Sequence, residues 1–179
     1  AAGSVALGAA VALNTNDNVV TARVGHGANL STTGDDDVQV VARDRSSVYA
    51  DAQGYSLSGA AAAGAVLATA RKTGAAAALV GSATPADKAT TVTLSGGGLS
   101  VTSERSGRVT AVTTAGSGAL GGALSVSTAT AKDDGDSRAV IGFGVSVKAP
   151  SGLVSVEAAS RPRVEAEARG YGGSLAVSV

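Results

Sequence analysis

An alternating phrase that occurs three times is the feature that most constrains the fold of this chain. The string "VVARDRSSVYADAQG" ends a first unit, and "VTSERSGRVTAVTTAG" and "VEAASRPRVEAEARG" end two later ones. Alignment of the three pairs Val40 with Val101 and Val156, at spacings of 61 and 55 residues. Self-similarity at a nearly fixed period indicates stacked structural repeats, in which each unit forms one layer.

Further anchors extend the alignment. The same offsets recur eight residues later at Val48, Val109 and Val164, then at Ala50, Ala111 and Ala166, and the closing glycines Gly54, Gly116 and Gly170 follow at spacings of 62 and 54. The extra length of the second unit falls in "GSATPADKATTVTLSGGG", which we expect to be a longer loop. The repeats are expected at about 1–54, 55–116 and 117–170, with the start of a fourth at 171–179. They form a single array over 1–179, interpreted as a fragment of a longer chain.

A second set of long phrases alternates with period two. Val5, Leu7, Ala9, Val11 and Leu13 point to one side, as do Leu120, Gly122, Leu124, Val126 and Thr128, and this alternation is typical of β-strands. The Ala-rich string "GAAAAGAVLATARKTGAAAAL" also suits a helix, since Ala is the strongest helix former. Glycines in the corresponding stretches, and Val and Thr at alternating positions in the sister repeats, favour strands.

The order of strands and turns predicts an all-β fold. Each unit contains strand, corner, strand, corner, strand, with corners such as "NTNDN", "KDDGD" and "APSG". Stacking in register gives a parallel β-solenoid (β-helix) of about three wide coils, with 55–62 residues per repeat; two or three narrower coils per unit remain an alternative. In the first phrase we expect Val40, Ala42, Val48 and Ala50 to face inward and Arg43, Arg45, Ser47 and Tyr49 to face water.

Composition narrows the possible classes of protein. The chain has 25 Gly, one Phe and no Trp, Met or Cys, so its core must consist of small side chains between closely spaced backbones. Fourteen basic residues balance fourteen acidic ones without a basic stripe, which argues against nucleic-acid binding. The lack of Cys excludes disulfides, Cys-type zinc sites and thiol catalysis, and suits an exported chain. No apolar stretch is long enough for a membrane span.

The first unit resembles a known family. The Gly/Ala-rich alternating strand, then "VALNTNDNVVTARV" and "ANLSTTGDDDVQVVA", resembles the repeats of large bacterial filamentous adhesins of the leukotoxin A and filamentous haemagglutinin type. The corner of Asn14, Asn16, Asp17 and Asn18 matches the family's Asn-containing turn. The second and third units depart from it with "RKTG" and "KDDGD", so no Asn ladder runs through the array. The resemblance implies a secreted or cell-surface β-solenoid without catalytic residues.

Candidate sites are few, and we assign no catalytic, cofactor-binding or metal residue. The single His, His26, lies in a Gly-flanked corner and is expected to be exposed. Calcium favours clustered carboxylates, but we interpret the two acidic corners as solvated turns that discourage edge pairing. They contain Asp35, Asp36 and Asp37, and Asp133, Asp134 and Asp136. The last unit carries an alternating outward row of Arg161, Arg163, Glu165, Glu167 and Arg169, interpreted as a solvated face.

The function expected from these observations is structural. The segment is predicted to be an extracellular stalk or fibre-forming spacer of a filamentous adhesin, with neighbouring repeats or identical subunits end to end as partners. The alternative is a carbohydrate- or calcium-binding module on a β-helix, with host or cell-surface glycans as ligands. A polysaccharide lyase is disfavoured because the chain has few aromatic residues, and an ice-binding array because its threonines share no register. No enzymatic activity is expected.

Overall fold

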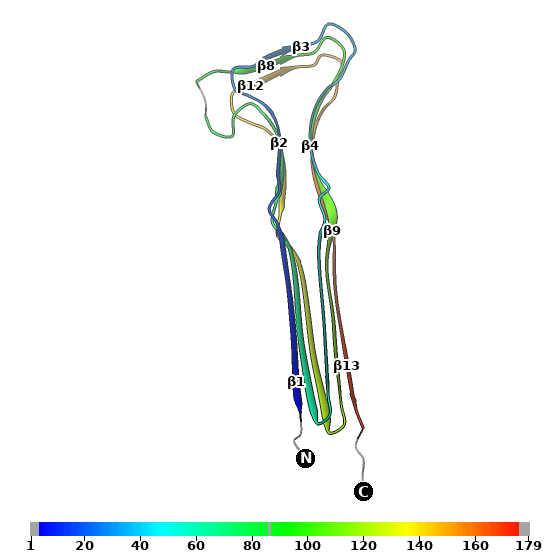
Figure 1. Ribbon diagram of the computed structural model, residues 1–179. Helices are drawn as coiled ribbons and strands as arrows, with labels where there is room; N and C mark the ends of the chain where they lie inside the picture. The colour runs from blue at the N-terminus through cyan, green and yellow to red at the C-terminus, as the bar shows by residue number, and fades with distance from the viewer. Residues whose placement is uncertain (1–3, 86, 176–179) are drawn as a thin grey trace.

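The computed structural model describes residues 4–85 and 87–175, and every regular element in these residues is a β-strand. The strands wind as three wide coils of a parallel β-solenoid, and each strand pairs with its counterpart in the next coil. Figure 1 shows a long, flattened body with a narrow lower part, a waist and a wider upper part. The predicted fold class, with one wide coil per repeat, is confirmed, and so is the choice of strand over helix for 61–72 and 75–80.

Four sheets run through the coils. The long sheet contains β1 (Val5–Asn16), β6 (Ala61–Lys72) and β10 (Gly122–Asp133). The upper sheet contains β2 (Val19–Val24), β7 (Ala75–Val80) and β11 (Asp136–Ile141). The cap sheet contains β3 (Asn29–Ser31), β8 (Thr90–Thr93) and β12 (Val145–Lys148). In the return sheet, β9 (Leu99–Ala119) lies between β13 (Val154–Ser174) and the pair β4 (Val38–Asp44) and β5 (Val48–Ser58).

The register of the return sheet confirms three of the four sets of anchors. Val101 pairs with Val40 and Val156, Val109 with Val48 and Val164, and Ala111 with Ala50 and Ala166. The column of closing glycines is wrong, because Gly54 and Gly170 both pair with Ala115. The offsets of 61 and 55 hold through to the end of the strands, so Gly116 pairs instead with Tyr55 and Tyr171.

The second coil is longer between β7 and β8. Residues paired in β2 and β7 are 56 apart, while those paired in β3 and β8 are 62 apart. The additional length therefore lies in 81–89, inside the predicted loop. Within the predicted loop, only Thr90–Thr93 was wrongly assigned, because it forms β8, the centre of the cap sheet. Each unit thus has a fourth, short strand at its far corner, which the prediction of three strands per unit did not include.

The interior holds small side chains, and many larger apolar ones lie outside. Val40, Ala42, Val48 and Ala50 are buried, while Arg43, Arg45, Ser47 and Tyr49 are exposed, as predicted. In the long sheet, Ala62, Val66, Ala68 and Ala70 face inward. The alternating larger apolar residues predicted to share one side lie on the outer surface, where six of them are exposed: Val5, Leu7, Val11, Leu13, Leu124 and Val126. Ala and Gly columns let the facing sheets approach closely.

The facing sheets pack in a zigzag. In the lower part, β5 packs against β1 and β6, β9 packs against β6 and β10, and β13 packs against β10. The lower core contains Val48, Ala50, Ala52, Val66, Ala68, Ala70, Val109, Ala111 and Ala115. The upper core lies between the upper sheet, the cap sheet, β4 and the first half of β9, and contains Val40, Ala42, Ala78, Val80, Val92, Leu94, Leu99 and Val101. The two apolar cores are separate clusters.

A glycine in the middle of β9 allows the return sheet to bend. Gly107, in the middle of β9, has a φ of 117°, a conformation that side chains with a Cβ rarely adopt. A Cβ at this position would also overlap the carbonyl oxygen of Ser46 in the first coil. In that coil, the strand is interrupted here, between Asp44 and Val48. The bend is thus built into neighbouring coils at the same height.

Candidate functional site

A buried ionic cluster lies where the long sheet meets the upper sheet. Lys72 and Asp133 occupy the last positions of β6 and β10. Asp44 occupies the last position of β4 and pairs with Arg105 of β9 in the return sheet. All four side chains point inward, and each is no more than 3% exposed. We call these four residues the ionic cluster.

The contacts in the ionic cluster run from coil to coil. Lys72 Nζ lies 3.0 Å from Asp44 Oδ2 and donates hydrogen bonds to the carbonyl oxygens of Ser46 (2.9 Å) and Ser106 (2.7 Å). Arg105 Nε lies 3.8 Å from the same Asp44 oxygen, and its Nη1 is ion-paired with Asp133 Oδ1. The two cations of the second coil therefore link an anion of the first coil to an anion of the third, and the four formal charges cancel.

Burial and hydrogen bonding act against each other at Asp44. Burial raises the pKa of its carboxyl group, but the Ser46 amide, whose nitrogen lies 2.9 Å from Oδ1, and the ammonium group of Lys72 lower it more. The net effect is a pKa below the ordinary value, so Asp44 is ionised at neutral pH. A buried ion pair adds little to stability compared with a well-packed apolar pair, but the loss of one partner is costly. The ionic cluster therefore ties the three coils to one register.

The sequence interpretation missed the ionic cluster. Asp133 was assigned to a solvated turn, which is wrong, because its side chain is 3% exposed and paired with Arg105. The available signal was the parity of the alternation: the inward row Ala68, Ala70 continues to Lys72, and the inward row Val40, Ala42 continues to Asp44. Lys72 and Asp133 continue the inward-facing rows of their strands, but the glycine and polar residues that follow them led to their assignment to turns.

The other predicted residues lie apart from one another. His26 is exposed in a turn between β2 and β3. Asp35, Asp36 and Asp37 form the corner between β3 and β4, where Asp37 Oδ1 accepts a hydrogen bond of 2.6 Å from the Gly98 amide. At the corner after β10, Asp134 is outward and pairs with Arg71 and Lys132, while Asp136 accepts from the Ser137 amide. Within 4–85 and 87–175, no group of three or more His, Asp or Glu side chains comes together as a metal site would require.

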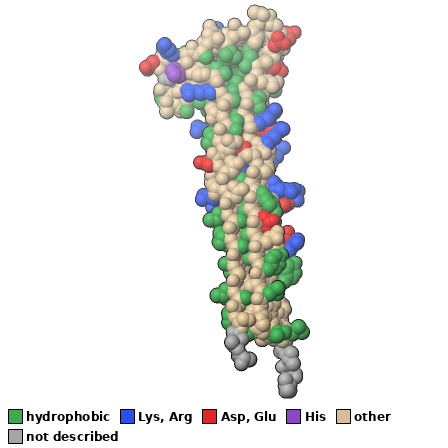
Figure 2. All heavy atoms as spheres, viewed as in Figure 1, with side chains coloured by type: hydrophobic (Ala, Val, Ile, Leu, Met, Phe, Trp, Pro, Cys, Tyr) green, Lys and Arg blue, Asp and Glu red, His purple; other side chains and the backbone are tan. Residues whose placement is uncertain are grey.

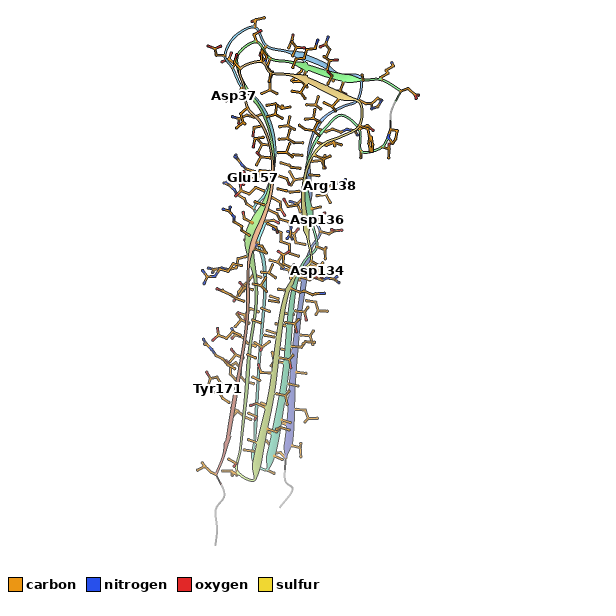
Figure 3. The ribbon with its side chains drawn as sticks, turned by 180° about the vertical axis from the view of Figure 1, so that it is seen from behind. Asp37, Asp134, Asp136, Arg138, Glu157 and Tyr171 are labelled. Carbon is orange, nitrogen blue, oxygen red and sulfur yellow. The ribbon has the colours of Figure 1, made fainter. Side chains whose placement is uncertain are left out.

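The charged row on β13 is on the outer surface, as predicted. Arg163 pairs with Glu165, which also lies 3.8 Å from Arg108 of the second coil, and Arg169 pairs with Glu167. These side chains are between 37% and 68% exposed, so each pair adds little stability. Figure 3 shows Glu157 and Tyr171 projecting from the outer side of β13.

All three tyrosines of the chain lie on the outer surface of the lower return sheet. Tyr49, Tyr55 and Tyr171 are 57%, 65% and 59% exposed. Tyr55 and Tyr171 flank Gly116 in one column, and the ring of Tyr55 leans over that glycine, where a Cβ would lie 2.6 Å from a ring carbon. Asp51 Oδ2 accepts hydrogen bonds from Tyr49 Oη (3.2 Å) and Gln53 Nε2 (3.3 Å). We call this surface the tyrosine face. Figure 2 shows hydrophobic side chains gathered below the charged ones on this wall.

Comparison with known proteins and structures found no similar one. No family model matches the chain, no curated protein matches it, and no solved structure matches it. In the part of the chain that the structure describes, no helix could cross a membrane. The class that the fold defines is that of the parallel β-solenoids, and the coil edges, the ionic cluster and the tyrosine face are the features that bear on function.

Proposed function

We propose that this chain is a structural repeat segment of a secreted or cell-surface filamentous adhesin, where it acts as a stalk or fibre-forming spacer. The observation that carries the proposal is the common register of four sheets through all three coils. Such an arrangement grows by addition of further coils, and its edge strands present unpaired backbone groups that pair with similar strands. Neighbouring repeats, or identical subunits end to end, are the partners that this geometry suits.

The sequence resemblance supports the extracellular part of the proposal. The Asn-containing corner of the first unit and the absence of Cys fit an exported filament. Antibodies raised against this segment should label intact, non-permeabilised cells of the source organism, and brief protease treatment of those cells should remove the signal. Labelling that requires permeabilisation would refute the proposed location.

A carbohydrate-binding module is the second candidate, and the tyrosine face favours it. Exposed aromatic rings next to carboxylate and amide groups offer stacking surfaces and hydrogen-bonding groups for a sugar, and here they lie on a flat sheet beside Asp51 and Gln53. Glycan arrays should separate the two candidates, because a spacer gives no saturable binding. Binding that is lost in the variant Tyr55→Ala/Tyr171→Ala and kept in Phe143→Ala, which removes an exposed aromatic ring elsewhere, would favour the second candidate.

A further inference from the structure

The third coil leaves the inward row of its return strand open. Val154, Val156 and Val164 are 42%, 47% and 45% exposed. Their partners in the second coil, Leu99, Val101 and Val109, are 1%, 0% and 0% exposed. These valines occupy the columns that form the cores of the other two coils, so the exposed row is interior surface without a cover.

The zigzag packing explains which element would cover it. β5 and β9 each pack between two strands of the long sheet, whereas β13 packs against β10 alone in that sheet. At the opposite edge, the return strands are already covered, since Val48 and Ala50 of the first coil are 2% and 3% exposed. A further coil would supply strands stacked on β10 and β11: the strand on β10 would cover Val164, and the strand on β11 would cover Val154 and Val156.

The ionic cluster indicates which type of residue the strand stacked on β10 should have at its end. Asp133 Oδ1 is occupied by Arg105 and by the Gly135 amide (3.1 Å), but Asp133 Oδ2 is buried and has no hydrogen-bond partner. The inward column of the long sheet here reads Asn16, Lys72, Asp133. A residue stacked next in this column would lie about 4.8 Å from Asp133, and covering a carboxylate oxygen that has no donor is costly. A Lys or Arg at this position would supply the missing donor.

The charges on the outer surface of the return sheet independently indicate a second residue that the added coil should contain. Between the first two coils, Glu104 lies 3.3 Å from Arg43 and 3.6 Å from Arg45 and so pairs with both. In the third coil, the column of Glu104 holds Ala159, two residues before Arg161. An acidic residue stacked on Ala159 would pair with Arg161 as Glu104 pairs with Arg45.

We propose that the open edge of the third coil is a docking surface for a further parallel β-coil with a Lys or Arg stacked on Asp133 and an acidic residue stacked on Ala159. The middle coil has this pattern, with Lys72 and Glu104. The first coil of a second copy of this chain does not, because it would place Asn16 on Asp133 and Arg43 on Ala159, next to Arg161. The edge thus selects a coil of middle-coil charge pattern over an identical chain. This inference rests on the proposed function in taking the coil edges as stacking surfaces.

The test extends the full chain by one coil of either pattern. Paired residues of β9 and β13 are 55 apart, and Val179 comes 55 residues after Leu124. Leu124 is equivalent to Ala63 in the second coil and to Leu7 in the first, so an added coil should continue from Gly64 or Gly8. Residues 64–119 with Arg105→Ser, added after Val179, therefore give a middle-type extension in register, and residues 8–58 with Asp44→Ser give a first-type extension; the two substitutions match Ser160, which occupies this column in the third coil. We expect the middle-type extension to slow amide hydrogen exchange in β13 by at least about tenfold relative to the parent chain, and the first-type extension to slow it clearly less.

Matched variants of the added coils separate the outcomes. Lys72→Met in the added middle-type copy should remove much of the protection, and Asn16→Lys in the added first-type copy should increase it. Equal protection by both extensions, or no effect of Lys72→Met, would overturn the charge selection and leave the proposed function intact. Protection by neither extension would overturn both, because the edge would then not stack coils at all.

Discussion

Removal of the Lys72 ammonium group should destabilise the protein far more than removal of a surface ammonium group. The variant Lys72→Met keeps the length of the side chain but leaves Asp44 buried, with Arg105 Nε at 3.8 Å as its nearest cation. It also deprives the carbonyl oxygens of Ser46 and Ser106 of their donor. Loss of one member of a buried ion pair costs about 3–5 kcal/mol, which for a chain of this length is about 10 °C in Tm.

The matched control is Lys132→Met, one residue before Asp133. Lys132 lies 3.0 Å from Asp134 Oδ2, but its side chain is 61% exposed, so the same substitution should cost at most about 1 kcal/mol. Urea unfolding followed by circular dichroism gives both values. The double variant Asp44→Asn/Lys72→Met restores charge balance and should be more stable than Lys72→Met alone. Equal losses for Lys72→Met and Lys132→Met, or a double variant no more stable than Lys72→Met, would refute the argument that the buried charges are coupled.

Three further predictions follow from burial and backbone geometry. The pKa of Asp44 is lower in the folded protein than in the unfolded chain, so its contribution to stability is present above about pH 4 and is lost as the pH falls through its lower folded pKa; acid titration of the urea midpoint should show a smaller drop in Asp44→Asn. Gly107→Ala should cost at least about 1–3 kcal/mol, whereas Gly122→Ala, where a Cβ meets nothing within 4 Å, should be nearly neutral in thermal melts. Ala68→Leu, at a position 0% exposed between closely packed sheets, should cost about 1–3 kcal/mol by overpacking, while Ala63→Leu on the outer surface should change Tm little; similar melting of the two Leu variants would contradict the assignment of the interior.

The fold class and the stacking of the coils could be predicted from the amino-acid sequence. Residues Val40, Val101 and Val156, spaced by 61 and 55, pair in one sheet, because in-register stacking places equivalent residues in one column and the apolar interior columns hold small apolar side chains. Alternation of period two likewise separated inward from outward residues, since successive side chains on a strand point to opposite faces.

The burial of particular charges and the exposure of one coil edge depend on contacts between distant parts of the chain, which the sequence pattern does not show. Asp133 and Asp134 are neighbours in one acidic corner, yet Asp133 is paired inside the coil and Asp134 outside, because the partner of Asp133 is Arg105, on the opposite wall, and no local pattern encodes that approach. The closing glycines were misaligned by one residue for a similar reason: Gly116 accommodates the ring of Tyr55 from the adjacent coil. The exposure of Val156 and Val164 depends on the zigzag order of the two walls, which arises only when complete coils pack face to face.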